Sequence, residues 1–165
     1  MRRISEMIGL PVMVTGEGIQ VGTVTEVVLD IDSATVFCLL LTDEPDSSQG
    51  VPMADIYRIG EDAVMLRDEK CIGDMAPLLN QAGLYPTRSI FGKDIITETG
   101  TNIGILTDMQ FDPATGELIR YVVSDGILVD WICGRKMMPL PVAQMISDDT
   151  VLVPESMSQL LQEDD

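Results

Sequence analysis

Short apolar stretches separated by glycine-containing turns occupy most of the chain. Val12 and Val14 precede a turn at Gly16, and a second apolar stretch then runs from Val21 to Leu29. Stretches of this length, rich in β-branched residues and bounded by glycine, aspartate or serine, are typical of β-strands joined by hairpins. Because no crossover helices are indicated between them, the pattern predicts a mainly all-β fold.

The same pattern occurs twice along the chain. Residues 8–43 align with residues 91–125, and a later Val-Pro-Met-Ala block at residues 51–54 aligns with Leu-Pro-Val-Ala at residues 140–143. Self-similarity at a fixed offset indicates a duplicated structural module. The aligned turn residues are Gly22 with Gly104 and Asp30 with Asp112, each pair 82 residues apart, and Gly9 with Gly92, 83 residues apart.

Each copy is predicted to be a small antiparallel β-barrel of five or six short strands. Closure is favoured because it removes the free strand edges that a small sheet otherwise exposes. Gly22 and Gly104 fall inside strand pattern, which usually marks a bulge or a tight bend. Asp30 and Asp112 each begin a hairpin turn, where an aspartate bonds to its own backbone.

We predict three segments from this pattern. Residues 1–70 form the first barrel, residues 71–88 a helical connector, and residues 89–165 the second barrel. A short helix at residues 75–82 is expected in the connector, because Asp74 can cap it and Gly83 can end it. The residues after Pro154 are expected to form a final short helix with Met157, Leu160 and Leu161 on one face.

The residues of the repeat resemble the PRC-barrel family. The resemblance rests on a hydrophobic-Gly start, a Gly-x-x-Val-Gly turn and strand, an Asp turn, and a Val-Pro-Met-Ala-Asp-Ile block, and it covers residues 4–66 and 88–153. This barrel occurs in the H subunit of photosynthetic reaction centres and in a ribosome maturation factor, where it docks to other subunits or to a ribosomal protein. The resemblance therefore implies a docking barrel and brings no catalytic residues with it.

Charge and targeting signals restrict the classes of partner. The chain carries 27 acidic and 10 basic residues, a formal net charge of −17. Nucleic-acid binding depends on Lys and Arg that neutralise phosphates, so direct binding of DNA or RNA is not expected. An acidic surface of this kind serves solubility, or it steers a basic protein partner. With no signal-peptide pattern and no stretch of ~20 apolar residues, a cytoplasmic protein without a membrane span is expected.

The chemistry available to catalysis is limited, and we predict a non-enzymatic protein without catalytic residues, metal or cofactor. The chain has no histidine, which removes the commonest general base and metal ligand. Its three cysteines, Cys38, Cys71 and Cys133, show neither zinc-ligand nor disulfide spacing. The nearest carboxylate pairs, Asp30 with Asp32 and Asp112 with Glu117, fall in predicted hairpin turns.

The two copies differ most in an insert before the second proline block. Residues 44–50 are polar and are predicted to form a loop in the first copy, whereas residues 124–138 of the second copy contain the only tryptophan. The insert is predicted to form a helix at about 125–133, either as a lid on the second barrel or as a docking patch, because Trp and Arg are enriched at binding hot spots. The candidate docking residues are Ile127, Leu128, Trp131, Ile132, Arg135 and Lys136.

The sequence therefore favours an adaptor that binds a protein partner through two barrels. The alternative from another class is a small-molecule or metal sensor that uses a cleft between the barrels. An enzyme that uses carboxylates alone is the third hypothesis. Eleven methionines supply adaptable apolar surface, so the sequence is also compatible with a homodimer.

Overall fold

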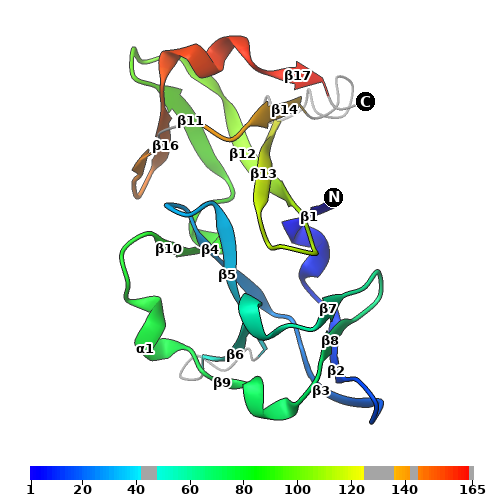
Figure 1. The fold of residues 1–165 in the computed structure, drawn as a ribbon. Helices are drawn as coiled ribbons and strands as arrows, with labels where there is room; N and C mark the ends of the chain where they lie inside the picture. The colour runs from blue at the N-terminus through cyan, green and yellow to red at the C-terminus, as the bar shows by residue number, and fades with distance from the viewer. Residues whose placement is uncertain (42–47, 125–135, 142–144, 164–165) are drawn as a thin grey trace. The chain divides into compact units, whose positions relative to one another are not determined.

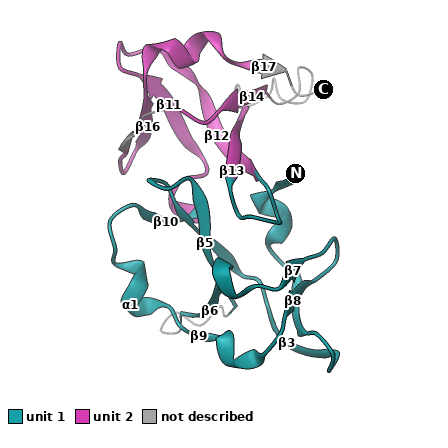
Figure 2. Cartoon of the chain, in the orientation of Figure 1, with its two compact units in different colours: residues 1–87, 111–117 teal, residues 88–110, 118–165 magenta. Residues whose placement is uncertain are grey.

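The fold is mainly β and divides into two compact units. The structure, a computed structural model, describes residues 1–41, 48–124, 136–141 and 145–163. Unit 1 comprises residues 1–87 and 111–117, and unit 2 comprises residues 88–110 and 118–165 (Figure 2). The second repeat thus contributes one hairpin tip, residues 111–117, to the unit built mainly from the first repeat.

One sheet of unit 1 combines two hairpins through a parallel pair. β2 and β3 form an antiparallel hairpin with a register shift between Val12 and Met13, and β7 and β8 form another. β2 pairs with β8 in parallel, with Val12 opposite Val64. The sheet order is β3 (Ile19–Thr23), β2 (Pro11–Val14), β8 (Val64–Leu66) and β7 (Arg58–Ile59) (Figure 1).

The other sheet of unit 1 is antiparallel throughout. Its two longest strands, β4 and β5, carry mostly buried side chains, and a register shift separates Val28 from Leu29. The sheet order is β10 (Leu84–Pro86), β4 (Glu26–Asp30), β5 (Thr35–Leu40), β6 (Gln49–Pro52) and β9 (Gly73–Asp74). The remaining elements before residue 90 are β1 (Arg2–Arg3), helix α1 (Ala76–Leu79) and four 3-10 helices, η1 (Ile4–Met7), η2 (Met53–Asp55), η3 (Glu69–Cys71) and η4 (Thr87–Ser89).

Unit 2 repeats this arrangement in one sheet. β12 is a single strand of ten residues that spans the positions of both β3 and β4, so it joins the two ladders that are separate in unit 1. The order is β15 (Met145–Ile146), β16 (Thr150–Val153), β11 (Lys93–Thr97), β12 (Asn102–Phe111), β13 (Leu118–Ser124), β14 (Lys136–Pro139) and β17 (Gln162–Glu163). A 3-10 helix, η5 (Glu155–Gln159), precedes β17.

Strand pairing is equivalent in the two repeats. β11 bonds to β12 with a register shift between Ile95 and Ile96, as β2 bonds to β3, and β11 pairs with β16 in parallel, as β2 pairs with β8. Single hydrogen bonds recur as well. The Thr25 hydroxyl donates to the Leu40 carbonyl at 3.2 Å, and the Thr107 hydroxyl donates to the Val122 carbonyl at 3.2 Å. The duplication seen in the sequence is therefore a duplication of hydrogen-bond pattern.

Closure of the two barrels, which the sequence analysis predicted, is absent from the described residues. In every sheet the two outermost strands do not pair with each other, so the ladders are open. In unit 1 the chain changes sheets at a corner: the Val24 amide donates to Leu10 at 2.9 Å, and the next amide, of Thr25, donates to Leu40 at 2.8 Å. Such a corner divides a short chain between two sheets.

The interior of each unit is mainly aliphatic, and α1 contributes to the core of unit 1. Val28, Cys38, Leu40 and Met75 form one buried cluster, against which Leu78 and Leu79 of α1 and two other partly buried side chains pack. Burial of a side chain of this size stabilises the fold by about 1.5–3 kcal/mol. In unit 2, Ile95, Leu106, Met109, Tyr121 and Val151 are fully buried.

The segments outside the repeat pattern are short. The Asp74 carboxylate accepts a hydrogen bond from the Ala76 amide at 3.0 Å, and the α1 helix that follows has four residues. Near the C-terminus, Met157 is buried in η5, whereas Leu160 is exposed. The insert helix predicted at about 125–133 lies outside the described residues. Among the helices that the structure describes, none is long and apolar enough to span a membrane.

Candidate functional site

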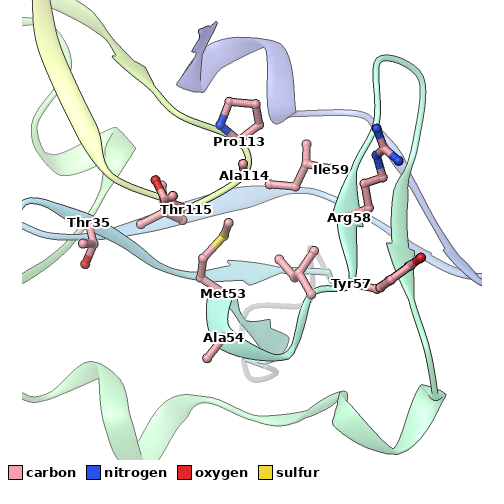
Figure 3. Close-up of a pocket in the computed structure, with 11 residues that line it drawn as sticks. Thr35, Met53, Ala54, Tyr57, Arg58, Ile59, Pro113, Ala114 and Thr115 are labelled. Carbon is pink, nitrogen blue, oxygen red and sulfur yellow. The ribbon is translucent and has the colours of Figure 1, made fainter.

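A groove of about 760 Å³ opens on unit 1 between two segments that are far apart in sequence. Met53 and Ile59 project from one side, and Pro113, Ala114 and Thr115 form the other (Figure 3). Its size falls in the range of sites that bind a small molecule or a few side chains of a partner. The lining residues are Thr35, Val36, Met53, Ala54, Ile56, Tyr57, Arg58, Ile59, Pro113, Ala114 and Thr115.

The first wall follows from the proline block of the sequence. Pro52 ends β6 with φ of −61° and leads into the 3-10 turn of η2, which closes where the Ile56 amide donates to the Met53 carbonyl at 3.2 Å. The Tyr57 amide then donates to the Met65 carbonyl at 3.0 Å and starts the β7–β8 hairpin. The residues of this wall are therefore held by backbone hydrogen bonds on both sides.

The second wall is the hairpin tip that the second repeat contributes. The Val36 amide donates to the Gly116 carbonyl at 2.8 Å, and Thr35 forms an antiparallel bridge with Glu117, its own counterpart 82 residues later. Gly116 has φ of 80°, and a Cβ added there would lie 2.9 Å from Cγ of Met53. Glycine suits this position because other residues rarely adopt a φ of 80°, and an added Cβ would also displace the Met53 side chain.

The charge of the groove differs from that of the whole chain. Arg58 is exposed and is the only charged residue among the described residues of the lining. Arg67 lies outside the lining, with its guanidinium 4.1 Å from the centre of the Tyr57 ring. Within the described residues, no carboxylate pairs with either arginine. The Asp112 carboxylate accepts the Ala114 amide at 2.8 Å and so faces its own turn. The groove thus combines an apolar interior with one cationic side chain, Arg58, and the stacked Tyr57–Arg67 pair lies beside it.

Most of the docking residues proposed from the sequence lie outside the described residues. This applies to Ile127, Leu128, Trp131, Ile132 and Arg135, so their role stays a prediction. Lys136 is described: it begins β14, is partly buried and pairs across the ladder with Val123.

The turn residues singled out in the sequence take up specific backbone roles. Gly9, Gly92 and Gly104 have positive φ values of 90°, 97° and 137°, whereas Gly22 does not. A Cβ at Gly22 would lie 3.3 Å from Cβ of Leu41, so this glycine serves close packing. Asp30 accepts the Ser33 amide at 3.1 Å, and Asp112 accepts the Ala114 amide, as expected of turn aspartates.

The described cysteines are poor nucleophiles at neutral pH. Burial raises the pKa of the Cys38 thiol to about 12 and also raises the pKa of Cys71, whose Sγ donates to the Asp68 carbonyl at 2.7 Å. Since the thiolate is the reactive form, neither thiol is activated. Over the part of the chain that the structure describes, no group of three or more His, Cys, Asp or Glu side chains is placed to hold a metal ion.

The sequence analysis missed the groove residues. Tyr57 and Arg58 directly follow the proline block, and an adjacent Tyr-Arg pair next to an apolar stretch was a usable signal. The wall at residues 113–115 gave no such signal, because it is a hairpin turn of the other repeat.

Comparison with known proteins agrees with the duplication. A family model described as the PRC-barrel domain matches the chain twice, over residues 1–70 and again over residues 83–160. No curated protein matches the chain.

Proposed function

The chain belongs to the PRC-barrel domain family, and we propose that it is a non-enzymatic docking protein whose two repeats each act as one PRC-type module. In this proposal the groove of unit 1 is the binding site for a protein partner in the cytoplasm. The proposal is carried by one observation: an apolar groove, built from both repeats, has Arg58 in its lining and the exposed Tyr57–Arg67 pair beside it, and neither arginine has an acidic partner among the described residues.

Three features support docking. PRC-barrel domains are known for protein–protein interaction, and the chain matches the family over both repeats. The groove is lined mostly by apolar side chains, with Thr35, Thr115 and Arg58 as its polar and charged groups, the composition typical of a binding site. Tyr and Arg are also the residue types enriched where binding energy concentrates. Together they favour recognition of a partner's side chains over chemistry.

The absence of an activated group among the described residues favours binding over catalysis. Cys38 and Cys71 both have raised pKa values, and the sequence contains no histidine. A carboxylate enzyme would need two facing carboxylates, but Asp30 and Asp112 each bond to the backbone of their own turn. We therefore propose that the protein has no catalytic activity.

The volume of the groove also favours a second candidate, a sensor of a small molecule. A ligand that binds only the folded protein raises its stability by mass action. A thermal-shift screen separates the two candidates. A metabolite that raises Tm in the parent protein but not in a Tyr57→Ser variant supports the sensor.

The docking proposal is tested by photocrosslinking in cells of the source organism. A p-benzoylphenylalanine placed at Ala54, which is exposed in the groove lining, should crosslink to one defined protein. The same photoreactive residue at Asp148, exposed in unit 2, serves as the matched control. The Ala54 product should disappear when Tyr57→Ser is added. Equal products from both positions, or no product from Ala54, contradict docking at the groove.

A further inference from the structure

The groove selects a particular kind of partner segment. We propose that it binds an extended peptide segment that carries an aromatic or aliphatic side chain flanked by carboxylates. This inference rests on the proposed docking function and specifies the partner of that same site.

The apolar side chain of such a segment has a defined place. Val36 and Ile59 are buried, Met53 is partly buried, and Pro113 faces them from the other wall. Met adapts its flexible side chain to different occupants, which suits a site that receives one side chain from another protein. The apolar interior therefore accounts for one half of the segment's chemistry.

The two arginines are the reason to expect carboxylates in the partner segment. In a chain with 27 acidic and 10 basic residues, Arg58 and Arg67 stand without a carboxylate partner among the described residues. Arg2 of the same unit behaves differently, since its guanidinium lies 3.6 Å from the Glu6 carboxylate. A guanidinium at the edge of an apolar groove binds a carboxylate through charge-assisted hydrogen bonds. The occupant that complements this rim is acidic.

Tyr57 lies at the edge of the groove, and its ring points away from Met53 and Pro113 (Figure 3). Its side chain is 49% exposed, its amide is bonded to Met65, and one face of its ring is covered by Arg67. A guanidinium stacked on a ring keeps its N–H edge free for a carboxylate. Tyr57 and Arg67 therefore contact the part of the segment that extends beyond the groove.

The acidic side chains nearest the groove do not oppose this assignment. Asp112 accepts the Ala114 amide within its own turn, and Asp55 interacts electrostatically with Cys71. Neither residue belongs to the lining. The net charge of −17 acts on an acidic partner at long range, where salt screens it, whereas the two arginines act at contact.

The test measures peptide binding by fluorescence polarisation. The probe is a fluorescein-labelled peptide, Ser-Gly-Asp-Phe-Asp-Leu-Gly-Ser, compared with versions in which both Asp residues are Asn or Lys. We expect the acidic probe to bind the full-length protein and both other probes to bind at least about tenfold more weakly. Arg58→Gln should weaken the acidic probe about tenfold, the effect of one charge-assisted hydrogen bond. Lys70→Gln makes the same change of charge at an exposed residue outside the lining, and should leave the affinity unchanged.

Each alternative outcome identifies what fails. If the Asn or Lys probe binds as well as the acidic probe and Tyr57→Ser abolishes it, the groove docks peptides but the acidic assignment is wrong. If no probe binds at about 1 mM, the limit of weak recognition, the assignment is also wrong. If analytical ultracentrifugation shows a dimer that dissociates in the Tyr57→Ser variant, the occupant of the groove is a second copy of this chain. Docking at the groove itself fails if the Ala54 crosslink is absent or is matched by an equal product from Asp148.

Discussion

Replacing Gly104 by alanine tests the close approach of two neighbouring strands in unit 2. Gly104 lies in β12 with φ of 137°, a conformation that side chains rarely adopt. An added Cβ would lie 2.5 Å from Cγ1 of Val123 and 2.7 Å from the carbonyl oxygen of Ser124 in β13. The second contact involves backbone, so it cannot be relieved by turning a side chain. Either the strands separate or the backbone of Gly104 changes.

Alanine substitutions at two other glycines separate the contributions of backbone strain and of overpacking to this destabilisation. Gly100→Ala adds a Cβ at φ of 91° with no atom within 4 Å, so it measures backbone strain alone, about 1–2 kcal/mol. Gly22→Ala, at the counterpart position of the first repeat, adds a Cβ 3.3 Å from a side-chain atom of Leu41 without a positive φ. The lower entropy of the unfolded chain offsets that contact, so the net change is under about 1 kcal/mol. Gly104→Ala combines strain with overpacking and should cost about 3–5 kcal/mol.

Urea unfolding followed by far-ultraviolet circular dichroism measures these differences. The expected order of destabilisation is Gly104→Ala, then Gly100→Ala, then Gly22→Ala. If the units unfold in separate transitions, the first two variants shift the transition of unit 2 and the third shifts that of unit 1. Equal destabilisation by Gly104→Ala and Gly100→Ala, within about 0.5 kcal/mol, would refute the close approach of β12 to β13.

Two further predictions concern buried groups. The Tyr121 hydroxyl is buried with no hydrogen-bond partner among the described residues, and the counterpart position in the first repeat is Leu39. Tyr121→Phe should therefore leave the free energy of unfolding unchanged or raise it by about 1 kcal/mol. A decrease of more than about 1 kcal/mol would show that the hydroxyl has a partner. Burial raises the pKa of Cys38 from 9.0 to about 12, so the folded state disfavours the thiolate. The free energy of unfolding should therefore fall as pH rises from 9 to 12. The fall should be smaller in the Cys38→Ala variant. Peptide mapping after alkylation at pH 8 should find Cys71 modified well before Cys38 in the folded protein.

The strand pattern and its duplication were predictable because their signals are local. Gly92 and Asp112 adopt the turn conformations that their residue types favour, and their counterparts Gly9 and Asp30 occupy equivalent turns. Matching two copies of a sequence also predicts that their strands pair in the same way, and the hydrogen-bond ladder of one repeat is reproduced in the other. The parallel pairing of β2 with β8 and of β11 with β16 was not predicted, because the sequence analysis expected antiparallel strands throughout each barrel.

The open sheets and the groove depend on contacts between distant residues. The corner at Val24 and Thr25 sends successive amides to different strands, yet the counterpart positions, Leu106 and Thr107, lie within the continuous strand β12. The residue types at these positions do not predict which repeat has the corner and which has the continuous strand. The groove likewise forms only when residues near 114 reach Met53, about 60 positions earlier in the chain. Sequence periodicity predicts single elements and does not predict contacts between elements that are far apart in the chain.

Hydrogen–deuterium exchange on the complex with the crosslinked partner tests the central claim most directly. Docking at the groove predicts slower exchange at residues 53–59 and 113–115 when the partner is bound, with residues 145–153 of unit 2 unchanged. Protection should be lost in Tyr57→Ser and kept in Lys70→Gln. Protection confined to unit 2, with residues 53–59 exchanging as in the free protein, would contradict the account.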